Sequence, residues 1–183
     1  MLPTLKNIEK VINSELSSKI KNSLIENDEI LIEVEEDELI EVVHFLKSNE
    51  NCKFKQLIDI AGVDYPEKEK RFELVYLFLS HEHNLRIKLL IKFQINQTIS
   101  TLTKIFPSAN WMEREVFDMY GIKFKNHPDL RRILTDYGFK GHPLRKDFPL
   151  TGFNEVRYSE KDKKVVYEPV KLEQNYRNFD FES

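Results

Sequence analysis

The chain has 183 residues, of which 40% are hydrophobic and 32% are charged, and its formal net charge at pH 7 is −3. This length allows one good hydrophobic core, and the composition is typical of a globular protein with a heavily charged surface. Its single cysteine, Cys52, excludes an internal disulfide, and one thiol alone can neither hold an iron–sulfur cluster nor complete a cysteine-based zinc site.

The first fifty residues predict a helix, a strand and a second helix. Apolar residues recur at three- and four-residue spacing over residues 5–20, which predicts an amphipathic helix. Asn27 and Asp28 mark a turn. The alternation of side chains over residues 30–34 predicts a strand with one solvent-exposed face. A second helix is expected over residues 37–47, where an acidic first turn favours the helix dipole.

Three apolar segments follow, over residues 53–65, 71–80 and 85–93. The second is apolar on both faces, which indicates a central strand, whereas the third alternates cleanly and predicts a half-exposed strand. Their short polar connections favour antiparallel hairpins. We expect a further helix over residues 97–106, stopped by Pro107.

The next predicted helix starts at Trp111, ends at Gly121 and carries an unusual carboxylate. Glu113 falls within the apolar arc of this helix, so packing of the arc would bury it. A buried carboxylate needs a cation or several N–H donors, and we expect a nearby arginine to supply the charge.

After Gly121 the chain loses its periodicity but keeps its apolar residues. Residues 121–152 combine prolines and glycines with leucines and aromatic residues, and seven cations against three anions give them a net charge of +4. A flexible linker has few aromatic residues, so this segment is expected to lie against a surface. Residues 156–158 and 165–167 are expected to form a short hairpin, and the aromatic tail is expected to order against another protein.

Together these elements predict an α+β fold: a mixed or antiparallel sheet of about four strands covered by helices, with an extended irregular C-terminal tail. We expect residues 1–120 to form the globular domain. Residues 121–183 are expected to form a motif segment and a tail that dock on partner proteins. No apolar run is long enough to span a bilayer, and the N-terminus lacks an apolar signal core.

Few residues offer a metal site or a reactive group. His81 and His83 flank Glu82 in a predicted hairpin loop, which makes a weak metal site without further ligands. Cys52 has no activating neighbour in the sequence, so a structural role is favoured. The lack of a glycine-rich phosphate loop argues against a bound nucleotide.

The carboxylates and histidines of the central stretch could act as acid and base only if the fold brought them together. Glu113 and Glu115 point to different sides of a helix, so a structural ion-pair network that includes Asp118 is favoured over catalysis. His127 and His142 each precede a proline, which is first of all an extended or turning dipeptide.

The run EREVFDMYGIKFKNHPDLRRIL, from Glu113 to Leu134, resembles the signature of the 30-kDa subunit, also called the C subunit, of proton-pumping NADH:quinone oxidoreductase, respiratory complex I. The likeness continues through TDYGFKGHPLRKDFPLTG and extends to LIDIAGVDYP, FELVY, EVRY, VVYEPV and FDF. It covers most of the chain from about Phe54 onward.

This resemblance implies a non-catalytic structural subunit of the hydrophilic arm, which supports electron transfer from NADH to quinone coupled to proton translocation. The chain itself would bind no cofactor, while other subunits carry FMN, the iron–sulfur clusters, NADH and quinone. Its implied partners are other complex I subunits, chiefly the larger D subunit and its neighbours in the quinone module. The implied location is the inner membrane, peripheral and held only through the complex, on the cytoplasmic side in a bacterium or the matrix side in a mitochondrion.

The resemblance assigns no catalytic, cofactor-binding or metal-binding residue. It assigns thirteen positions to the motif that shapes and docks the surface: Glu113, Arg114, Glu115, Asp118, His127, Pro128, Asp129, Arg131, Arg132, Arg145, Lys146, Asp147 and Pro149.

Three alternatives stay open. A related photosynthetic NDH or membrane-bound hydrogenase complex would contain an equivalent subunit. The +4 stretch would suit a nucleic-acid-binding module, although an acidic protein surface fits better because the whole chain is acidic. Glu113 with His127 or His142 would suit a free-standing hydrolase.

Overall fold

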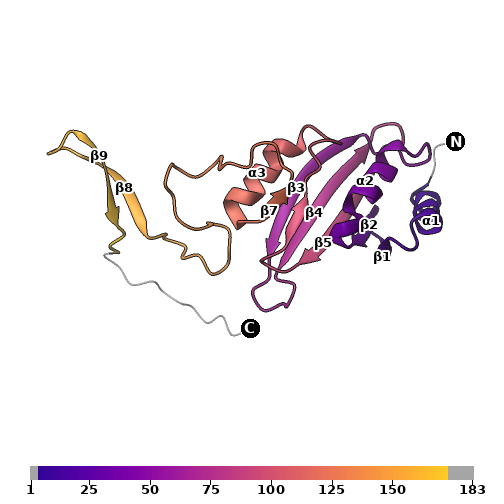
Figure 1. Cartoon of the computed structure of the whole chain (residues 1–183), viewed down its shortest axis with the longest axis horizontal. Helices are drawn as coiled ribbons and strands as arrows, with labels where there is room; N and C mark the ends of the chain where they lie inside the picture. Colours follow the sequence, from indigo (N-terminus) through magenta and orange to yellow (C-terminus); the bar gives the residue numbers. More distant parts are fainter. Residues whose placement is uncertain (1–3, 173–183) are drawn as a thin grey trace.

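The principal sheet has five strands in the order β1–β2–β5–β4–β3, in a computed structural model that describes residues 4–172 (Figure 1). The α+β prediction is confirmed, and the sheet is mixed: β2 and β5 are parallel, whereas the other neighbours are antiparallel. It has one strand more than predicted. The strands are β1 Ile20–Glu26, β2 Glu29–Val34, β3 Gln56–Asp64, β4 Phe72–Ser80 and β5 Leu85–Phe93.

The helix predicted over residues 5–20 ends early, and the extra strand, β1, begins at its last predicted residue, Ile20. Helix α1 spans Leu5–Glu15 only, and β1 pairs with β2 through a turn in which Asn27 and Asp28 both have positive φ. Apolar spacing alone cannot separate these elements, because the hydrogen-bonding partner of β1 lies further along the chain.

Helices α1 and α2 (Leu39–Ser48), the latter preceded by a 3₁₀ turn η1 at Glu36–Glu38, pack on the sheet. The helix predicted over residues 37–47 is therefore confirmed. One hydrophobic core joins both helices to the sheet, and its fully buried side chains include Ile8, Ile12, Leu39, Val43, Ile32, Leu89, Tyr76 and Phe78.

The helix predicted over residues 97–106 is wrong. Thr98–Ser100 forms strand β6, which pairs in parallel with β7 (Lys123–Lys125). Ile99 and Phe124 are register partners and are both buried in the core. A three-residue strand whose partner lies some twenty-five positions away leaves no periodic signal, and its pairing decides its conformation.

Helix α3 (Ala109–Tyr120) matches the helix predicted before Gly121, and Gly121 ends it in the left-handed conformation with φ 75°. The helix packs against β3 at Gly62, where an added Cβ would lie 2.7 Å from the Tyr120 ring. This close approach sets the position of α3 on the sheet, and therefore the position of the polar side chains of this helix.

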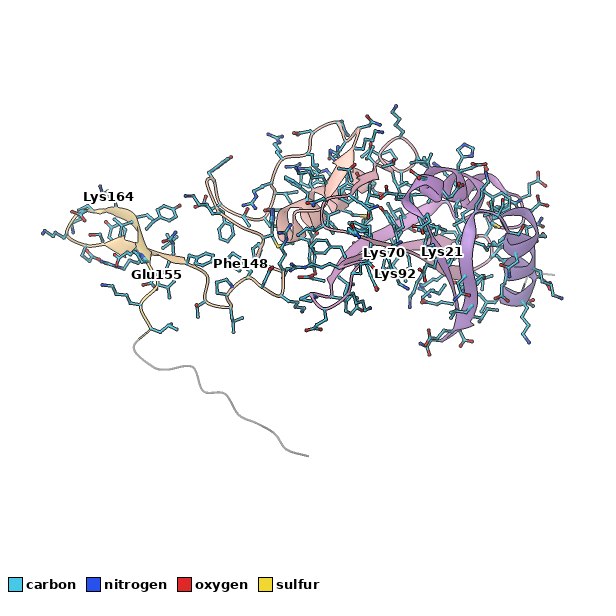
Figure 2. The ribbon with its side chains drawn as sticks, turned by 60° about the horizontal axis from the view of Figure 1, so that its bottom comes forward. Lys21, Lys70, Lys92, Phe148, Glu155 and Lys164 are labelled. Carbon is cyan, nitrogen blue, oxygen red and sulfur yellow. The ribbon has the colours of Figure 1, made fainter. Side chains whose placement is uncertain are left out.

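After β7 the chain continues as an arm, residues 131–169, that extends away from the sheet. It ends in the predicted hairpin, β8 (Asn154–Ser159) and β9 (Lys164–Pro169), at the far end of the molecule from α1 (Figure 1). Figure 2 shows Phe148, Glu155 and Lys164 along this arm, well apart from Lys21 and Lys70 on the body. The expectation for the tail beyond residue 172 lies outside the described residues. No helix in the described part of the chain has the length and apolarity needed to cross a membrane.

Candidate docking site

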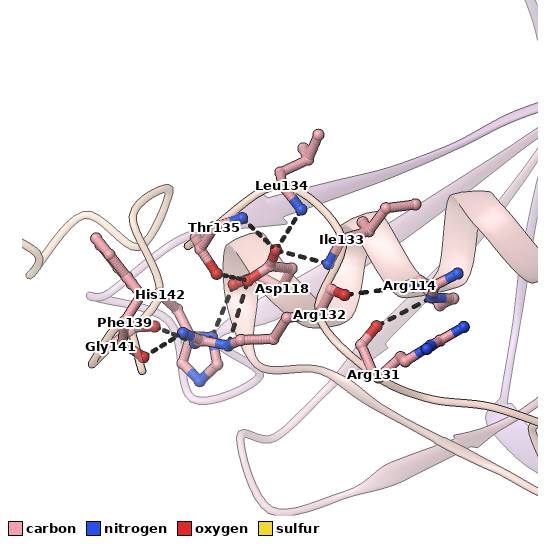
Figure 3. Close-up of polar contacts among 10 residues, drawn as sticks. All are labelled: Arg114, Asp118, Arg131, Arg132, Ile133, Leu134, Thr135, Phe139, Gly141 and His142. Atoms are coloured by element: carbon pink, nitrogen blue, oxygen red, sulfur yellow. Dashed lines mark hydrogen bonds and ion pairs between the residues drawn. The ribbon is translucent and has the colours of Figure 1, made fainter. Parts of the chain in front are cut away.

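Asp118 is the centre of a polar cluster that holds the segment after α3 against this helix (Figure 3). Its carboxylate is fully buried and accepts hydrogen bonds from the backbone N–H groups of Ile133, Leu134 and Thr135 at 3.1, 2.7 and 2.8 Å. The Thr135 hydroxyl donates a fourth, at 2.7 Å. Although burial alone raises the pKa of Asp118, these donors outweigh it and hold the pKa below its ordinary value.

Two arginines complete the cluster. Arg132 Nε lies 3.3 Å from the Asp118 carboxylate, and its Nη1 donates to the Phe139 carbonyl at 2.6 Å. Arg114, on α3, donates to the carbonyl oxygens of Arg131 and Arg132. Arg114 and Asp118 lie on a side of α3 that the segment covers, so both are buried.

The C-terminal end of α3 is closed by His142 and Arg145. His142 Nδ1 lies 2.9 Å from the Asp118 carbonyl oxygen, to which it donates, and Arg145 Nε donates to the Tyr120 carbonyl at 2.5 Å. Burial, together with the charges of Arg145 and Arg132, lowers the pKa of His142. The ring is therefore neutral at pH 7, and it acts as a hydrogen-bond donor rather than as a cation.

A second cluster ties the segment to the β3–β4 hairpin. Arg71 binds Asp64 through two bonds of 2.6 and 2.8 Å and reaches Asp147 at 2.9 Å, while the Lys146 N–H donates to Asp64 at 2.8 Å. The Arg71 guanidinium lowers the pKa of both carboxyl groups. The sequence motif contains Lys146 and Asp147, but their partners Asp64 and Arg71 were not assigned, because they lie more than seventy positions away.

Glu113 is buried as predicted, but the expectation of an arginine partner is wrong. Its carboxylate accepts the Thr101 hydroxyl at 2.5 Å and the Leu102 N–H at 2.7 Å. His127 Nε2 lies 3.8 Å away and is 3.2 Å from the Asn110 carbonyl oxygen, while His127 Nδ1 is 3.0 Å from the Asp129 N–H. Without a cation, burial raises the pKa of Glu113 to about 7.

The remaining motif residues lie outside these clusters. Asp129 and Arg131 form an exposed ion pair of 2.9 Å, and Glu115 is exposed on α3, on a different side from buried Glu113. Pro128 is exposed and Pro149 is half-buried. The structure thus brings Arg114, Asp118 and Arg132 together and sets Lys146 and Asp147 in the second cluster. Outside these clusters it pairs Asp129 with Arg131 and places His127 beside Glu113.

The geometry offers little for catalysis. Glu113 and Glu115 face apart, and no group of three or more His, Cys, Asp or Glu within residues 4–172 is arranged to hold a metal ion. Burial raises the pKa of the Cys52 thiol to about 11, so it stays protonated at neutral pH. His81 lies in the β4–β5 turn, 2.5 Å from the Gln56 amide oxygen. Fold and site together define an α+β protein whose polar clusters hold a surface segment against α3 and the β3–β4 hairpin.

Comparison with known proteins identifies the family. Residues 32–154 match the model of the respiratory-chain NADH dehydrogenase 30-kDa subunit. Among curated relatives, the NADH-quinone oxidoreductase C subunit of Chelativorans sp. is 49% identical over 99% of this chain and 90% of its own length. The same subunit of Ruegeria pomeroyi is 57% identical over 85% of this chain and 78% of its own length. The chain belongs to the family of the 30-kDa subunit, or C subunit, of NADH:quinone oxidoreductase.

Solved structures share the fold. The trypsin-resistant fragment (1–134) of Nqo5 is 25% identical, with a TM-score of 0.56 over 67% of this chain and 98% of that fragment. A chain of the archaeal membrane-bound sulfane sulfur reductase is 22% identical, with a TM-score of 0.67 over 92% of this chain and 98% of that chain. The second similarity shows the fold alone.

Proposed function

We propose that this chain is a structural subunit of the hydrophilic arm of NADH:quinone oxidoreductase and that it docks on the D subunit through the segment that follows α3. One observation carries the proposal: the segment is held in place by Asp118 and Arg132 inside, while several of its large apolar side chains face outward. Leu150 and Phe153, for example, are 85% and 62% exposed. A segment built this way gains burial only when another protein covers it.

The hairpin supports the same function. Val156, Tyr158, Val165 and Tyr167 share one face of the ribbon, because Val156 pairs with Tyr167 and Tyr158 with Val165. Each of these side chains is more than half exposed. An isolated two-stranded hairpin is marginally stable in water, so this apolar face is expected to pack on a partner.

In this proposal the chain holds no cofactor, and FMN, the iron–sulfur clusters, NADH and quinone are bound by other subunits. The single cysteine supports it, because iron–sulfur clusters are held by several cysteine thiolates. The proposed location is peripheral at the inner membrane, on the cytoplasmic or matrix side, with membrane contact only through the complex. The respiratory relatives at 49% and 57% identity favour this complex over a hydrogenase or photosynthetic NDH.

The test is a native gel of gently solubilised membranes, probed for this chain and stained for NADH dehydrogenase activity. Co-migration in one large band, together with binding of the purified chain to the D subunit, is the expected result. A small species absent from the active band would overturn the proposal. Salt-sensitive binding to nucleic acid in that species would then point to the basic segment as a nucleic-acid-binding site.

A further inference from the structure

Residues 131–141 form a loop in which backbone N–H and carbonyl groups face the protein while large apolar side chains face solvent. An ordinary surface loop has the opposite arrangement. Three backbone N–H groups point inward to Asp118, and two carbonyl groups point inward to Arg114. The Arg132 guanidinium donates hydrogen bonds to the carbonyl oxygens of Phe139 and Gly141 (Figure 3). An ordinary loop leaves such groups to water. Here the protein satisfies them, so the loop has a defined shape before any partner binds.

The apolar side chains of the same loop point the other way. Tyr137 is fully exposed and Leu134 is 61% exposed. Single exposed apolar residues are common on protein surfaces, but these two have an apolar neighbour. Tyr167 of β9, 62% exposed, donates its hydroxyl to the carboxylate of Asp136, which lies between them in the sequence. This hydrogen bond joins the hairpin to the loop, and the three exposed apolar side chains of the two, Leu134, Tyr137 and Tyr167, define the apolar patch.

Such a patch has the properties of a binding anchor. A tyrosine gives a large contact area with few rotatable bonds, and aromatic anchors carry much of the energy of protein interfaces. The hydrogen bonds to Asp118 and Arg132 order the backbone in advance, which reduces the entropy lost on binding.

The charges of the segment after α3 indicate the kind of partner. Lys123, Lys125 and Lys140 are exposed and form no ion pair among residues 4–172. The arginines of the segment, in contrast, are engaged within the protein: Arg132 with Asp118, Arg131 with Asp129, and Arg145 with the Tyr120 carbonyl. An apolar patch on a segment that carries these exposed lysines is complementary to an apolar pocket with an acidic rim.

We propose that Leu134 and Tyr137 are the anchor of the docking surface and insert into an apolar, acid-rimmed pocket of a partner protein, with Asp118 and Arg132 as positioning residues. The inference rests on the proposed function in taking the D subunit as that partner. It goes further in assigning the binding energy to two side chains and their supporting carboxylate.

The first experiment measures the affinity of the full-length chain for the purified D subunit. Tyr137→Ala is expected to weaken binding at least tenfold, and the Leu134→Ala/Tyr137→Ala double variant more than either change alone. Both side chains are exposed, so thermal unfolding should stay unchanged. Tyr65→Ala and Ile95→Ala, exposed apolar residues outside the segment, serve as matched controls and are expected to bind within twofold of the wild type.

The second experiment tests the positioning residue by hydrogen exchange. Asp118→Asn should speed exchange of the Ile133, Leu134 and Thr135 amides and weaken binding to the D subunit, although Asp118 is buried. Glu115→Gln, an exposed change on the same helix, should alter neither. Unchanged exchange at these amides in Asp118→Asn would overturn the positioning role.

The outcomes separate the two proposals. If the wild-type chain fails to bind the D subunit, the proposed function fails, and this inference fails with it. If the wild type binds and the double variant binds equally well, the anchor is overturned while the proposed function stands. Loss of single-stranded DNA binding in Tyr137→Ala, with full binding to the D subunit retained, would also overturn the anchor and make the patch a nucleic-acid surface.

Discussion

The sheet body and the arm of residues 131–169 bury opposite kinds of groups. In the body, Leu89 and Tyr76 are fully buried, and charged groups pair on the outside, as Lys88 does with Glu29 at 2.6 Å. In the arm, Asp118 and Arg132 hold the backbone from inside, and most aromatic residues are exposed. The body can be stable alone because it removes apolar surface from water, whereas in the proposed function the arm gains that stabilisation on docking.

The largest expected effect separates a buried leucine from an exposed one. Leu89→Ala removes a fully buried side chain from β5 and should lower the free energy of unfolding by about 2–5 kcal/mol. Leu150→Ala, in the arm, where the side chain is 85% exposed, should change it by less than about 0.5 kcal/mol. Urea unfolding of both variants measures this. Equal losses would mean that the arm has a core of its own.

The next effect depends on pH and concerns Glu113, which joins α3 to the body. Its pKa in the folded protein is about 7, above the ordinary 4.5, so the folded state binds the proton more tightly than the unfolded state. Ionisation therefore costs nothing below pH 4.5. The cost grows as the pH rises from 4.5 to 7 and reaches about 3 kcal/mol above that range.

Glu113→Gln cannot ionise, so its stability relative to the wild type should rise between pH 5 and pH 8. Urea unfolding at these two values measures the difference. Asp64 and Asp118 have lowered pKa values, so their contribution is lost only as the pH falls through and below about 3.8, outside this window. A variant with the same pH slope as the wild type would exclude Glu113 as the responsible group.

A smaller effect concerns the glycine that ends α3. Gly121 has φ 75°, and a Cβ added there would lie 2.6 Å from His142 Nε2. Gly138, in the loop, has φ 77° but no atom within 4 Å of such a Cβ. Each substitution by alanine should therefore cost about 1–2 kcal/mol of conformational energy, and Gly121→Ala should cost more because His142 must move. Comparing the thermal unfolding of Gly121→Ala with that of Gly138→Ala isolates the steric contribution to the loss of stability.

The smallest expected effect lies on the surface of the body. Lys92 pairs with Glu33 at 2.8 Å across β5 and β2, with about a third of the lysine side chain exposed. Exposed ion pairs contribute little, so Lys92→Gln should lower the free energy of unfolding by less than about 1 kcal/mol. It should leave binding to the D subunit unchanged. A loss of binding would extend the docking surface from the arm to the body.

The sequence predicts well where the signal is local. The period of α3, its end at Gly121 and the burial of Glu113 follow from helical geometry, and all three are observed. The alternation in β5 and the turn at Asn27 and Asp28 are likewise observed, although strand β1 before that turn was not predicted. The resemblance of the run from Glu113 to Leu134 gives the family, because no generic periodicity produces such a motif.

Other features were fixed only by contacts between distant parts of the chain. The strand at Thr98–Ser100 exists because of its partner at Lys123–Lys125, which overrides the expected helix. Glu113 is held by Thr101 and Leu102 because that turn lies against α3, so no arginine reaches it. Arg114 and Asp118 are buried because the arm folds back over them.

The sequence by itself therefore determined the family, the α+β class and the positions of most helices and strands, since each depends on periodicity or on a local motif. Only the tertiary structure decided that Asp118 organises the loop, that Asp64 and Arg71 hold Lys146 and Asp147, and that Tyr137 faces outward. The physical reason is that hydrogen-bond and ion-pair partners are chosen by distance in space, and spacing along the chain carries no record of them.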